Sequence, residues 1–372
     1  MIFEALDVFR QRGSLVHCVV NDWKNDAVVA CAESIGATWS PGSYRNPLRL
    51  RNRGFAAGAS AAASTLRTSA GLLALFLRFR PTAVFASDFG SILRNSAALA
   101  ILRTAGIPVV LYMQNAPPAT PRYARLFRRV IDPLITRYVC ASHHTEGMLI
   151  SFGIASKKVG YANNFAADAA SSPAPPRDPK LVVFAGQMIP QKGLDILLEA
   201  LAIVAQAEPL AQLHVASRID GWIAPEYAEY RDAVLARAEE IDLRGRVTFL
   251  GWCDDVPGLL AKAAVHCAAS RSEMHEGMPL VCLEAKVVAT PSVVPSIGPF
   301  PEIVTHCVDG WVCPELSPAS LADGLIYFLA NPIAARSAGQ AARASATLFS
   351  RLEFERNWDA QVAQMAPRRG WS

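Results

Sequence analysis

Two carboxylates, Glu276 and Glu284, stand eight residues apart around a Gly-Met-Pro turn and an apolar run. Gly277 can adopt a positive φ and bring backbone amides close to a ligand, and Pro279 suits the first turn of a helix, where its missing N–H is not needed. The residues from Leu280 to Val288 are mostly good helix formers. The stretch therefore predicts a loop that carries Glu276 and a helix that carries Glu284 about two turns from its start.

A helix that begins beside such a loop can bind an anion. Its first backbone N–H groups have no partner inside the helix, and the macrodipole favours negative charge at that end. Phosphate groups and sugar hydroxyl oxygens are therefore the ligands that we expect here. The alternative is an ordinary surface helix whose acidic residues only favour the macrodipole.

Four stretches of the chain resemble, in order and spacing, the successive sequence blocks of glycosyltransferase family 4. They are FAGQMIPQKGLDILLEAL at 184–201, VTFLGWCDDVPGLLAKA at 247–263, EGMPLVCLEA at 276–285 and SIGPFPEIVTHCVDGWV at 296–312. The third looks like the Glu-x7-Glu signature of that family. The resemblance implies an α/β protein of GT-B architecture, in which two Rossmann-like domains with doubly wound parallel sheets face a central cleft. It also implies a retaining hexosyl transfer from a UDP- or GDP-sugar, with no metal and no cofactor.

The resemblance also implies roles in the donor site. Glu284 would accept hydrogen bonds from both ribose hydroxyls, because its two oxygens can receive two donors. Lys192 would neutralise the diphosphate as it leaves, and Glu276 would face the hydroxyls of the transferred sugar, so these two are the candidate catalytic residues. The implied donor-binding residues are Gly186, Gln187, Lys192, Arg218, Glu276, Gly277, Met278, Pro279, Leu280, Glu284, Gly298, Pro299 and Phe300.

Two places depart from the family pattern. Gln187 stands where the family usually has an arginine, so one positive charge that would stabilise the leaving group is missing. Arg218 or a backbone N–H would have to compensate for this missing charge. The loop Gly298-Pro299-Phe300, which should close over the sugar, is bulkier than the usual Gly-rich form, so the selectivity for the sugar is open. For Lys192 the alternative is a solvated lysine at the start of a helix.

Short apolar strands alternate with helices in residues 1–165, which predicts an acceptor-side domain with a parallel, doubly wound sheet. We expect a helix at 1–13, strands at 14–20, 82–88, 107–115 and 137–142, and a helix at 91–104. Family members normally open with a strand and a Gly-rich loop, and this domain is expected to lack both. Loops at the carboxyl ends of parallel strands carry function. They give Asp88, Gln114, Asn115 and His143 as acceptor-side candidates.

Residues 166–180 are rich in Ala, Ser and Pro and are predicted to be a linker. The order of strand, loop and helix then starts again, so 181–350 are predicted to form the domain that binds the nucleotide sugar. In the last stretch, 351–372, Phe354, Trp358 and Val362 recur every four residues, which predicts an amphipathic helix. By resemblance, this helix would pack back on the N-terminal domain.

The composition is that of a globular chain with room for more than one core: 372 residues, 52% hydrophobic and 18% charged. Eight cysteines without a C-x-x-C pair predict buried free thiols in a reducing compartment. The charged first residues form no signal-peptide core, and the apolar run LLALFLRF is too short to span a bilayer. We therefore expect a cytoplasmic protein without a transmembrane segment.

The charge is divided unevenly. Residues 1–170 hold 19 Lys and Arg against 9 Asp and Glu, whereas the rest of the chain is acidic. Two arginine clusters lie in this basic half: Arg45, Arg49, Arg51 and Arg53, then Arg122, Arg125, Arg128 and Arg129. Basic clusters with apolar neighbours suit an anionic membrane surface or a diphosphate-bearing lipid, and no nucleic-acid motif accompanies them. The alternative is that they are solvated helix faces.

Three functions remain open at this point. The first is sugar transfer to a cell-envelope, exopolysaccharide or lipid-linked saccharide. The second is a non-catalytic GT-B scaffold or nucleotide-sugar-binding subunit, which would bind the donor without turnover. The third is a sugar-nucleotide epimerase, which would need an acid and a base that the sequence does not reveal. No metal site is expected, because the acids form no D-x-D pair and the histidines are scattered.

Overall fold

The computed structural model describes residues 1–21, 25–42, 55–115, 117, 120–167, 176–219, 227–271 and 276–365, with the backbone alone for 55–64 and 365. The first predicted arginine cluster (Arg45, Arg49, Arg51 and Arg53), most of the predicted linker and residues 272–275 lie outside these ranges. The chain divides into two compact units. Unit 1 comprises Met1–Ala162 with Glu355–Ser372, and unit 2 comprises Asn163–Phe354.

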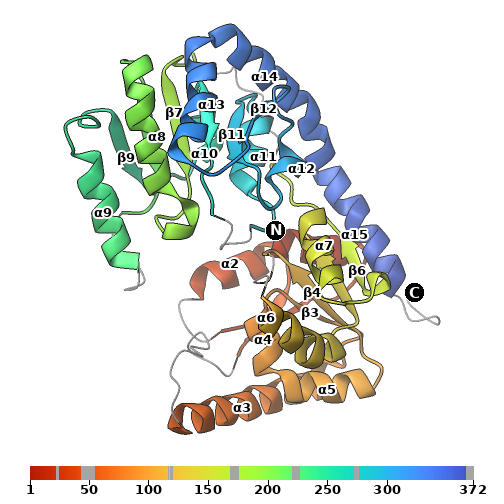
Figure 1. The fold of residues 1–372 in the computed structure, drawn as a ribbon. Helices are drawn as coiled ribbons and strands as arrows, with labels where there is room; N and C mark the ends of the chain where they lie inside the picture. Colours follow the sequence, from red (N-terminus) through yellow and green to blue (C-terminus); the bar gives the residue numbers. More distant parts are fainter. Residues whose placement is uncertain are drawn as a thin grey trace. The chain divides into compact units, whose positions relative to one another are not determined.

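Unit 2 is built on one six-stranded parallel sheet with the strand order β12-β11-β10-β7-β8-β9 (Figure 1). Its strands are β7 (Leu181–Ala185), β8 (Gln212–Ala216), β9 (Val247–Gly251), β10 (Val265–Cys267), β11 (Ser292–Pro295) and β12 (Gly310–Cys313). The helices are α8 (Leu194–Ala207), α9 (Ala228–Ala238), α10 (Val256–Ala261), α11 (Leu280–Val287), α12 (Phe300–Ile303), α13 (Pro318–Ala330) and α14 (Pro332–Ser345). The described part of this unit also has the short turns η4 (Pro190–Lys192) and η7 (Ala346–Phe349).

Successive side chains of each strand point to opposite faces of the sheet, and both faces are apolar here. Helices therefore cover both faces. In β7, Val182 and Phe184 belong to the large core that includes side chains of α8 and α13. Leu181 and Val183 belong to a smaller core with side chains of α10 and α11. Strands that are apolar on both faces are typical of parallel sheets in α/β proteins.

The strand order places a topological switch point beside β7. From β7 the chain moves outward to β8 and β9, and then returns to β10 on the other side of β7. Connections that leave in opposite directions open a crevice at the carboxyl ends of the strands. The loops after β7, β8, β9 and β10 therefore surround the place where an α/β sheet usually binds its ligand.

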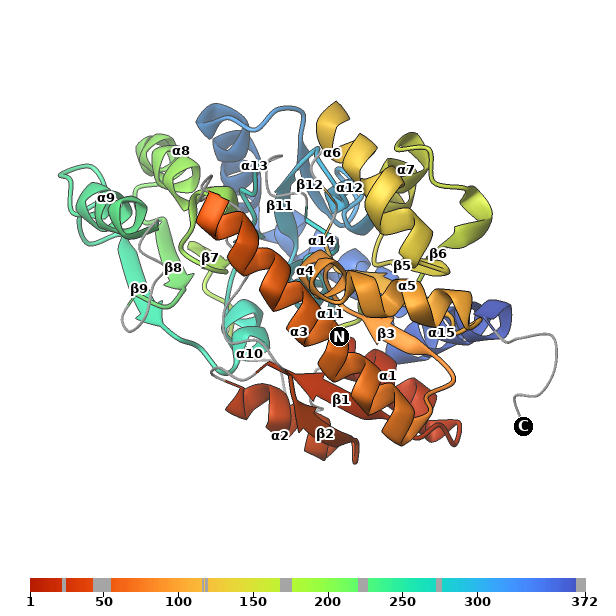
Figure 2. The same cartoon turned by 90° about the horizontal axis from the view of Figure 1, so that it is seen from below.

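Unit 1 has two parallel sheets, β1-β2 and β3-β4-β5-β6 (Figure 2). The strands are β1 (His17–Val20), β2 (Thr38–Pro41), β3 (Val84–Ala86), β4 (Val109–Met113), β5 (Arg137–Cys140) and β6 (Val159–Tyr161). The helices are α1 (Ile2–Gln11), α2 (Asp26–Ser34), α3 (Phe55–Phe79), α4 (Phe89–Arg94), α5 (Ser96–Thr104), α6 (Pro121–Leu126) and α7 (His143–Ser151). A π-helical turn, η1 (Phe127–Ile131), continues α6, and the 3₁₀ turns η2 (Asp132–Leu134) and η3 (Ser156–Lys158) follow. Both units are thus α/β with parallel sheets, as predicted.

Two elements of unit 1 differ from the prediction. The strand expected at 14–20 begins at His17 and is not buried throughout, since Val19 is 42% exposed. The helix expected at 91–104 is two helices that meet at Asn95. The side-chain amide of Asn95 donates to the carbonyl oxygen of Ser91 over 2.9 Å. Such a local bond competes with regular helix geometry.

The C-terminal helix α15 (Arg351–Met365) completes the core of unit 1 (Figure 1). Its Trp358 is fully buried, with ring centroids 5.8 Å from Phe85 and 4.9 Å from Tyr112. Gln361 accepts hydrogen bonds from the guanidinium of Arg137 and donates to the carbonyl oxygen of Tyr161 over 3.1 Å. These contacts bind the second half of the helix to unit 1.

Candidate functional site

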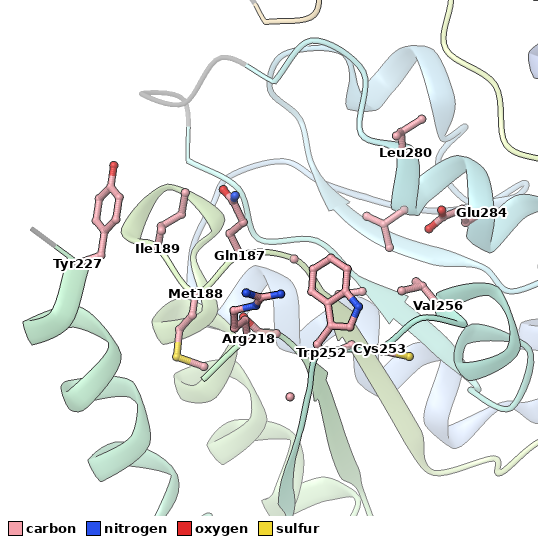
Figure 3. Close-up of a pocket in the computed structure, with 16 residues that line it drawn as sticks. Gln187, Met188, Ile189, Arg218, Tyr227, Trp252, Cys253, Val256, Leu280 and Glu284 are labelled. Carbon is pink, nitrogen blue, oxygen red and sulfur yellow. The ribbon is translucent and has the colours of Figure 1, made fainter. Parts of the chain in front are cut away.

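A cavity of about 620 Å³ opens in unit 2 at the carboxyl ends of β7, β8 and β9 (Figure 3). It is lined by the last residue of each of these strands and the residues that follow: 185–189 at β7, 216–218 at β8 and 251–253 at β9. Tyr227 and Val256 line it from the starts of α9 and α10, and Leu280, Val281 and Glu284 line it from α11. Of the predicted donor-binding residues, Gly186, Gln187, Arg218, Leu280 and Glu284 therefore meet around one cavity.

The loop after β7 ends in the turn η4, where backbone geometry requires a glycine. Gly193 has φ +67°, and a Cβ added there would lie 1.9 Å from the carbonyl oxygen of Ala269. Only glycine permits this close approach between the turn and the end of β10. Lys192 is the last residue of this turn and directly precedes Gly193.

Lys192 and Glu276 are neighbours in space although 84 residues separate them. The ammonium of Lys192 pairs with Oε1 of Glu276, and the hydroxyl of Ser270 donates to the same oxygen over 2.8 Å. Glu276 is only 9% exposed. The two predicted catalytic residues thus meet, but as an ion pair, and neither of them lines the cavity.

The turn before α11 is fixed by a residue far away in the sequence. The side-chain amide of Asn164 donates to the carbonyl oxygen of Met278 over 3.1 Å, and both residues are buried. Pro279 stands at the N-cap of α11 and not within its first turn as predicted. With no side-chain oxygen there, the helix has no side-chain cap. The N–H of Cys282 donates to the carbonyl oxygen of Pro279 over 3.2 Å, so within the described ranges the N–H groups of Leu280 and Val281 are the ones that remain available to a ligand.

Glu284 lies four residues after Leu280, about one helical turn inside α11 and not two, because α11 begins at Leu280. Its carboxylate lines the cavity and has no hydrogen-bond partner among the described residues. Burial raises the pKa of Glu284, since removal from water disfavours the charged form. A half-buried carboxylate with free acceptor oxygens can bind hydroxyl groups of a ligand.

The residues Gly298, Pro299 and Phe300 lie apart from the cavity. Gly298 has φ +54°, and a Cβ on it would lie 4.0 Å from the carbonyl oxygen of Glu276. The side chain of Phe300 is 1% exposed at the start of α12. The loop is therefore a neighbour of Glu276, and Phe300 belongs to the interior of unit 2.

The cavity residues that were not singled out from the sequence include Ser217, Trp252 and Cys253. Trp252 is 66% exposed, and the guanidinium carbon of Arg218 lies 5.0 Å from the centre of its ring. Figure 3 shows this pair beside the cavity. These residues follow β8 and β9 directly. Functional residues often follow the carboxyl ends of parallel strands, and the sequence prediction used this rule only for residues 1–165. The same rule applied to the strands of unit 2 would have identified these residues.

The acceptor-side candidates share one edge of the larger sheet in unit 1. Asp88 follows β3, Gln114 and Asn115 follow β4, and His143 begins α7 after β5. Asp88 caps α4 by accepting the backbone N–H of Ser91 over 2.8 Å. That contact gives Asp88 a structural role in the helix.

The other candidates have different surroundings. Asn115 is exposed, and the side-chain nitrogen of Gln114 is buried without a partner among the described residues. His143 contacts Glu146 through Nδ1 over 2.6 Å and stacks on Tyr161 with ring centroids 4.0 Å apart. The side chain of His143 is therefore held between a carboxylate and an aromatic ring.

Other features of the described chain bear on partners and location. No helix there combines the length and apolar character needed to cross a bilayer. No three His, Cys, Asp or Glu residues within those ranges gather where a metal ion could bind. All eight cysteines are free, but only four of them are buried, and Cys31 and Cys307 are exposed. The expectation of buried thiols therefore holds for half of them.

The part of the chain that holds this cavity is similar to known proteins. Residues 167–345 match the model of the glycosyl transferases group 1. Over 174 residues the chain is 33% identical to the D-inositol 3-phosphate glycosyltransferase of Segniliparus rotundus, which covers 46% of this chain and 37% of that protein. It is 31% identical over 165 residues to the phosphatidyl-myo-inositol mannosyltransferase of Mycobacterium tuberculosis, which covers 42% and 40%. The chain therefore matches about two fifths of the length of these curated relatives.

Solved structures resemble the chain over nearly its whole length. Anabaena HepE in complex with UDP-glucose has a TM-score of 0.76 and 17% identity, and the match covers 97% of this chain and 94% of that chain. A glycosyltransferase from Rickettsia africae has a TM-score of 0.75 and 11% identity, with 98% and 95% covered. At these identities the likeness shows the fold, which is of the GT-B type.

Proposed function

We propose that this protein transfers a sugar from a UDP- or GDP-sugar to a saccharide acceptor with retention of configuration, because residues 167–345 match the model of the glycosyl transferases group 1. The relatives support the reaction class, since both are named as glycosyltransferases or mannosyltransferases. The donor class is supported by HepE, whose structure contains UDP-glucose. The acceptor that we propose is a cell-envelope, exopolysaccharide or lipid-linked saccharide.

The observation that carries the proposal is the cavity that holds Glu284. Its volume of about 620 Å³ lies within the range of about 300–1,000 Å³ usual for small-molecule sites. The carboxylate of Glu284 would accept both ribose hydroxyls, and the first N–H groups of α11 would face phosphate oxygens. We place the nucleotide part of the donor in this cavity.

Lys192 and Glu276 would act at the sugar end of the donor. Oε1 of Glu276 already accepts hydrogen bonds from Lys192 and Ser270, so Oε2 is the atom open to a sugar hydroxyl. Lys192 would add positive charge as the bond from the anomeric carbon to the diphosphate breaks. The acceptor oxygen would form its bond on the same face of the sugar, and its proton would pass to the departing phosphate. In this scheme the protein positions the donor and the acceptor and stabilises the negative charge on the departing diphosphate.

The acceptor side of the proposal concerns unit 1. Arg122, Arg125, Arg128 and Arg129 are all exposed on α6 and η1. Leu126, between Arg125 and Arg128, is 48% exposed, and Val130, directly after Arg129, is 39% exposed. This mixture suits the anionic face of a membrane that carries a lipid-linked acceptor, with an attraction of about 1 kcal/mol for each basic residue near the surface.

The membrane part has its own test. Charge reversal at Arg125, Arg128 and Arg129 should release the protein from anionic vesicles at low salt and leave donor binding unchanged. Reversal at Arg244, Arg336 and Arg343, three exposed arginines of unit 2, is the matched control. If the unaltered protein does not sediment with anionic vesicles even at low salt, the acceptor is a molecule free of the membrane.

The function is tested by product analysis with the full chain, UDP- and GDP-hexoses and saccharide acceptors. We expect release of UDP or GDP only when an acceptor is present, and a product with the donor's anomeric configuration. Glu284→Gln should weaken nucleotide binding by about 1–3 kcal/mol, because one acceptor oxygen is replaced by a donor. Binding without turnover would mean a non-catalytic scaffold, an isomerised donor would mean an epimerase, and an inverted product would contradict retention.

A further inference from the structure

The cavity contains a single cationic side chain among the described residues that line it, and this side chain is Arg218. Lys192, the other cation nearby, lies outside the cavity lining and is paired with Glu276. Glu284 adds a negative charge to the same lining. A ligand that brings phosphate groups into this cavity therefore needs the charge of Arg218.

Arg218 is held in place by an aromatic ring. Its guanidinium carbon lies 5.0 Å from the centre of the Trp252 ring, within the range of cation–π attraction. The indole N–H of Trp252 in turn donates to Asp254 over 2.6 Å, which fixes the ring. Arg218 forms no ion pair within the part of the chain that the structure describes. Its N–H groups therefore remain available for phosphate oxygens.

A second group in the cavity lacks a partner. Ser217 lines the cavity next to Arg218 and is only 3% exposed. Its hydroxyl is buried and has no hydrogen-bond partner among the described residues. Buried polar groups are nearly always satisfied in native proteins, so this hydroxyl indicates that a bound molecule completes the site.

We propose that Arg218, stacked on Trp252, binds the diphosphate of the nucleotide donor together with the hydroxyl of Ser217. This inference rests on the proposed function, since it takes a nucleotide as the ligand. Arg218 thus binds the diphosphate in the ground state beside the first N–H groups of α11, whereas Lys192, paired with Glu276, adds its charge as the bond to the sugar breaks. Arginine suits this task because its planar fork can give two N–H groups to one phosphate.

The test measures affinities of the full chain for UDP and UMP, and for GDP and GMP, by calorimetry. Arg218→Gln should lower the affinity for the diphosphate at least tenfold and bring it close to that for the monophosphate. Trp252→Ala should have a smaller effect in the same direction, and Trp252→Phe should keep most of the affinity. Gln187 lines the same cavity, so Gln187→Arg in the Arg218→Gln background should restore part of the loss.

The control is Arg343→Gln, an exposed arginine on α14 outside the cavity, which should change neither affinity. Arg218 is itself exposed, so its replacement should leave the melting temperature unchanged. An unchanged diphosphate affinity in Arg218→Gln would overturn the inference. Equal losses for diphosphate and monophosphate would also overturn it, because Arg218 would then contact another part of the nucleotide. If the unaltered protein binds no nucleotide at all, the proposed function itself is wrong.

Discussion

The side-chain amide of Asn164 donates a hydrogen bond over 3.1 Å to the carbonyl oxygen of Met278, and both residues are buried. The bond joins the first residues of unit 2 to the turn that precedes α11. It therefore helps to set the position of the helix N-terminus that we assign to phosphate binding.

Asn164→Ala should loosen this turn. The carbonyl oxygen of Met278 would lose a buried donor, which costs about 1–3 kcal/mol in the free energy of unfolding. The nucleotide affinity should fall as well, because the N–H groups of α11 shift. Asn331→Ala is the matched control, since the Asn331 amide donates to the carbonyl oxygen of Tyr327 over 2.9 Å at an exposed site. Chemical denaturation and calorimetry measure both effects, and equal losses in the two variants would contradict the role of Asn164.

Gly193→Ala should disturb the turn that carries Lys192. The added Cβ would lie 1.9 Å from the carbonyl oxygen of Ala269, so the backbone has to move in addition to the strain at φ +67°. Gly245→Ala separates the two effects, because Gly245 has φ +77° and no atom within 4 Å of an added Cβ. We expect about 1–2 kcal/mol for the strain alone and a larger loss at Gly193. Sugar transfer should fall only in Gly193→Ala. Equal melting temperatures for the two variants would argue against the close contact.

His266 should make unit 2 sensitive to acid. Burial lowers its pKa from 6.5 to about 3. The pKa of His266 is lower in the folded protein than in the unfolded protein. The contribution of neutral His266 to the free energy of unfolding is therefore full above pH 6.5 and is lost as the pH falls toward 3. The loss is about 1.4 kcal/mol for each pH unit in that window. His266→Gln, which can still contact Ser292, should lose less stability between pH 7 and pH 5 in urea titrations. Parallel losses in the two proteins would show that His266 does not control the acid sensitivity.

Glu284 should give the nucleotide affinity a pH dependence. Burial raises its pKa above the usual 4.5, and only the ionised form offers all its oxygen lone pairs to ribose hydroxyls. Affinity should therefore increase as the pH rises through the raised pKa, while the contribution of Glu284 to stability is lost over the same range. In Glu284→Gln the affinity should be lower and should change less with pH. Calorimetry from pH 4.5 to 7.5 checks this, and identical profiles would exclude Glu284 from the site.

Much of unit 2 could be predicted from the sequence, because short apolar strands and the order of the four blocks define its elements locally. Glu284 could be placed on a helix for the same reason, although its depth was misjudged by about one turn. The Lys192–Glu276 pair and the Arg218–Trp252 stack could not be predicted as contacts. Each joins separate loops, and only the strand order brings them together. The break at Asn95 was missed because one polar side chain overrides a helical pattern there.

Helix α15 has a consequence for how the chain is made. Phe354 packs with Phe165 in unit 2, whereas Trp358, four residues later, fills the core of unit 1 beside Phe85. A ribosome therefore releases all of unit 2 before the residue that completes unit 1 emerges. We infer that the core of unit 1 stays incomplete during synthesis until Trp358 has left the ribosome. A nascent chain stopped before Trp358 would expose the apolar surface that this side chain covers in the folded protein.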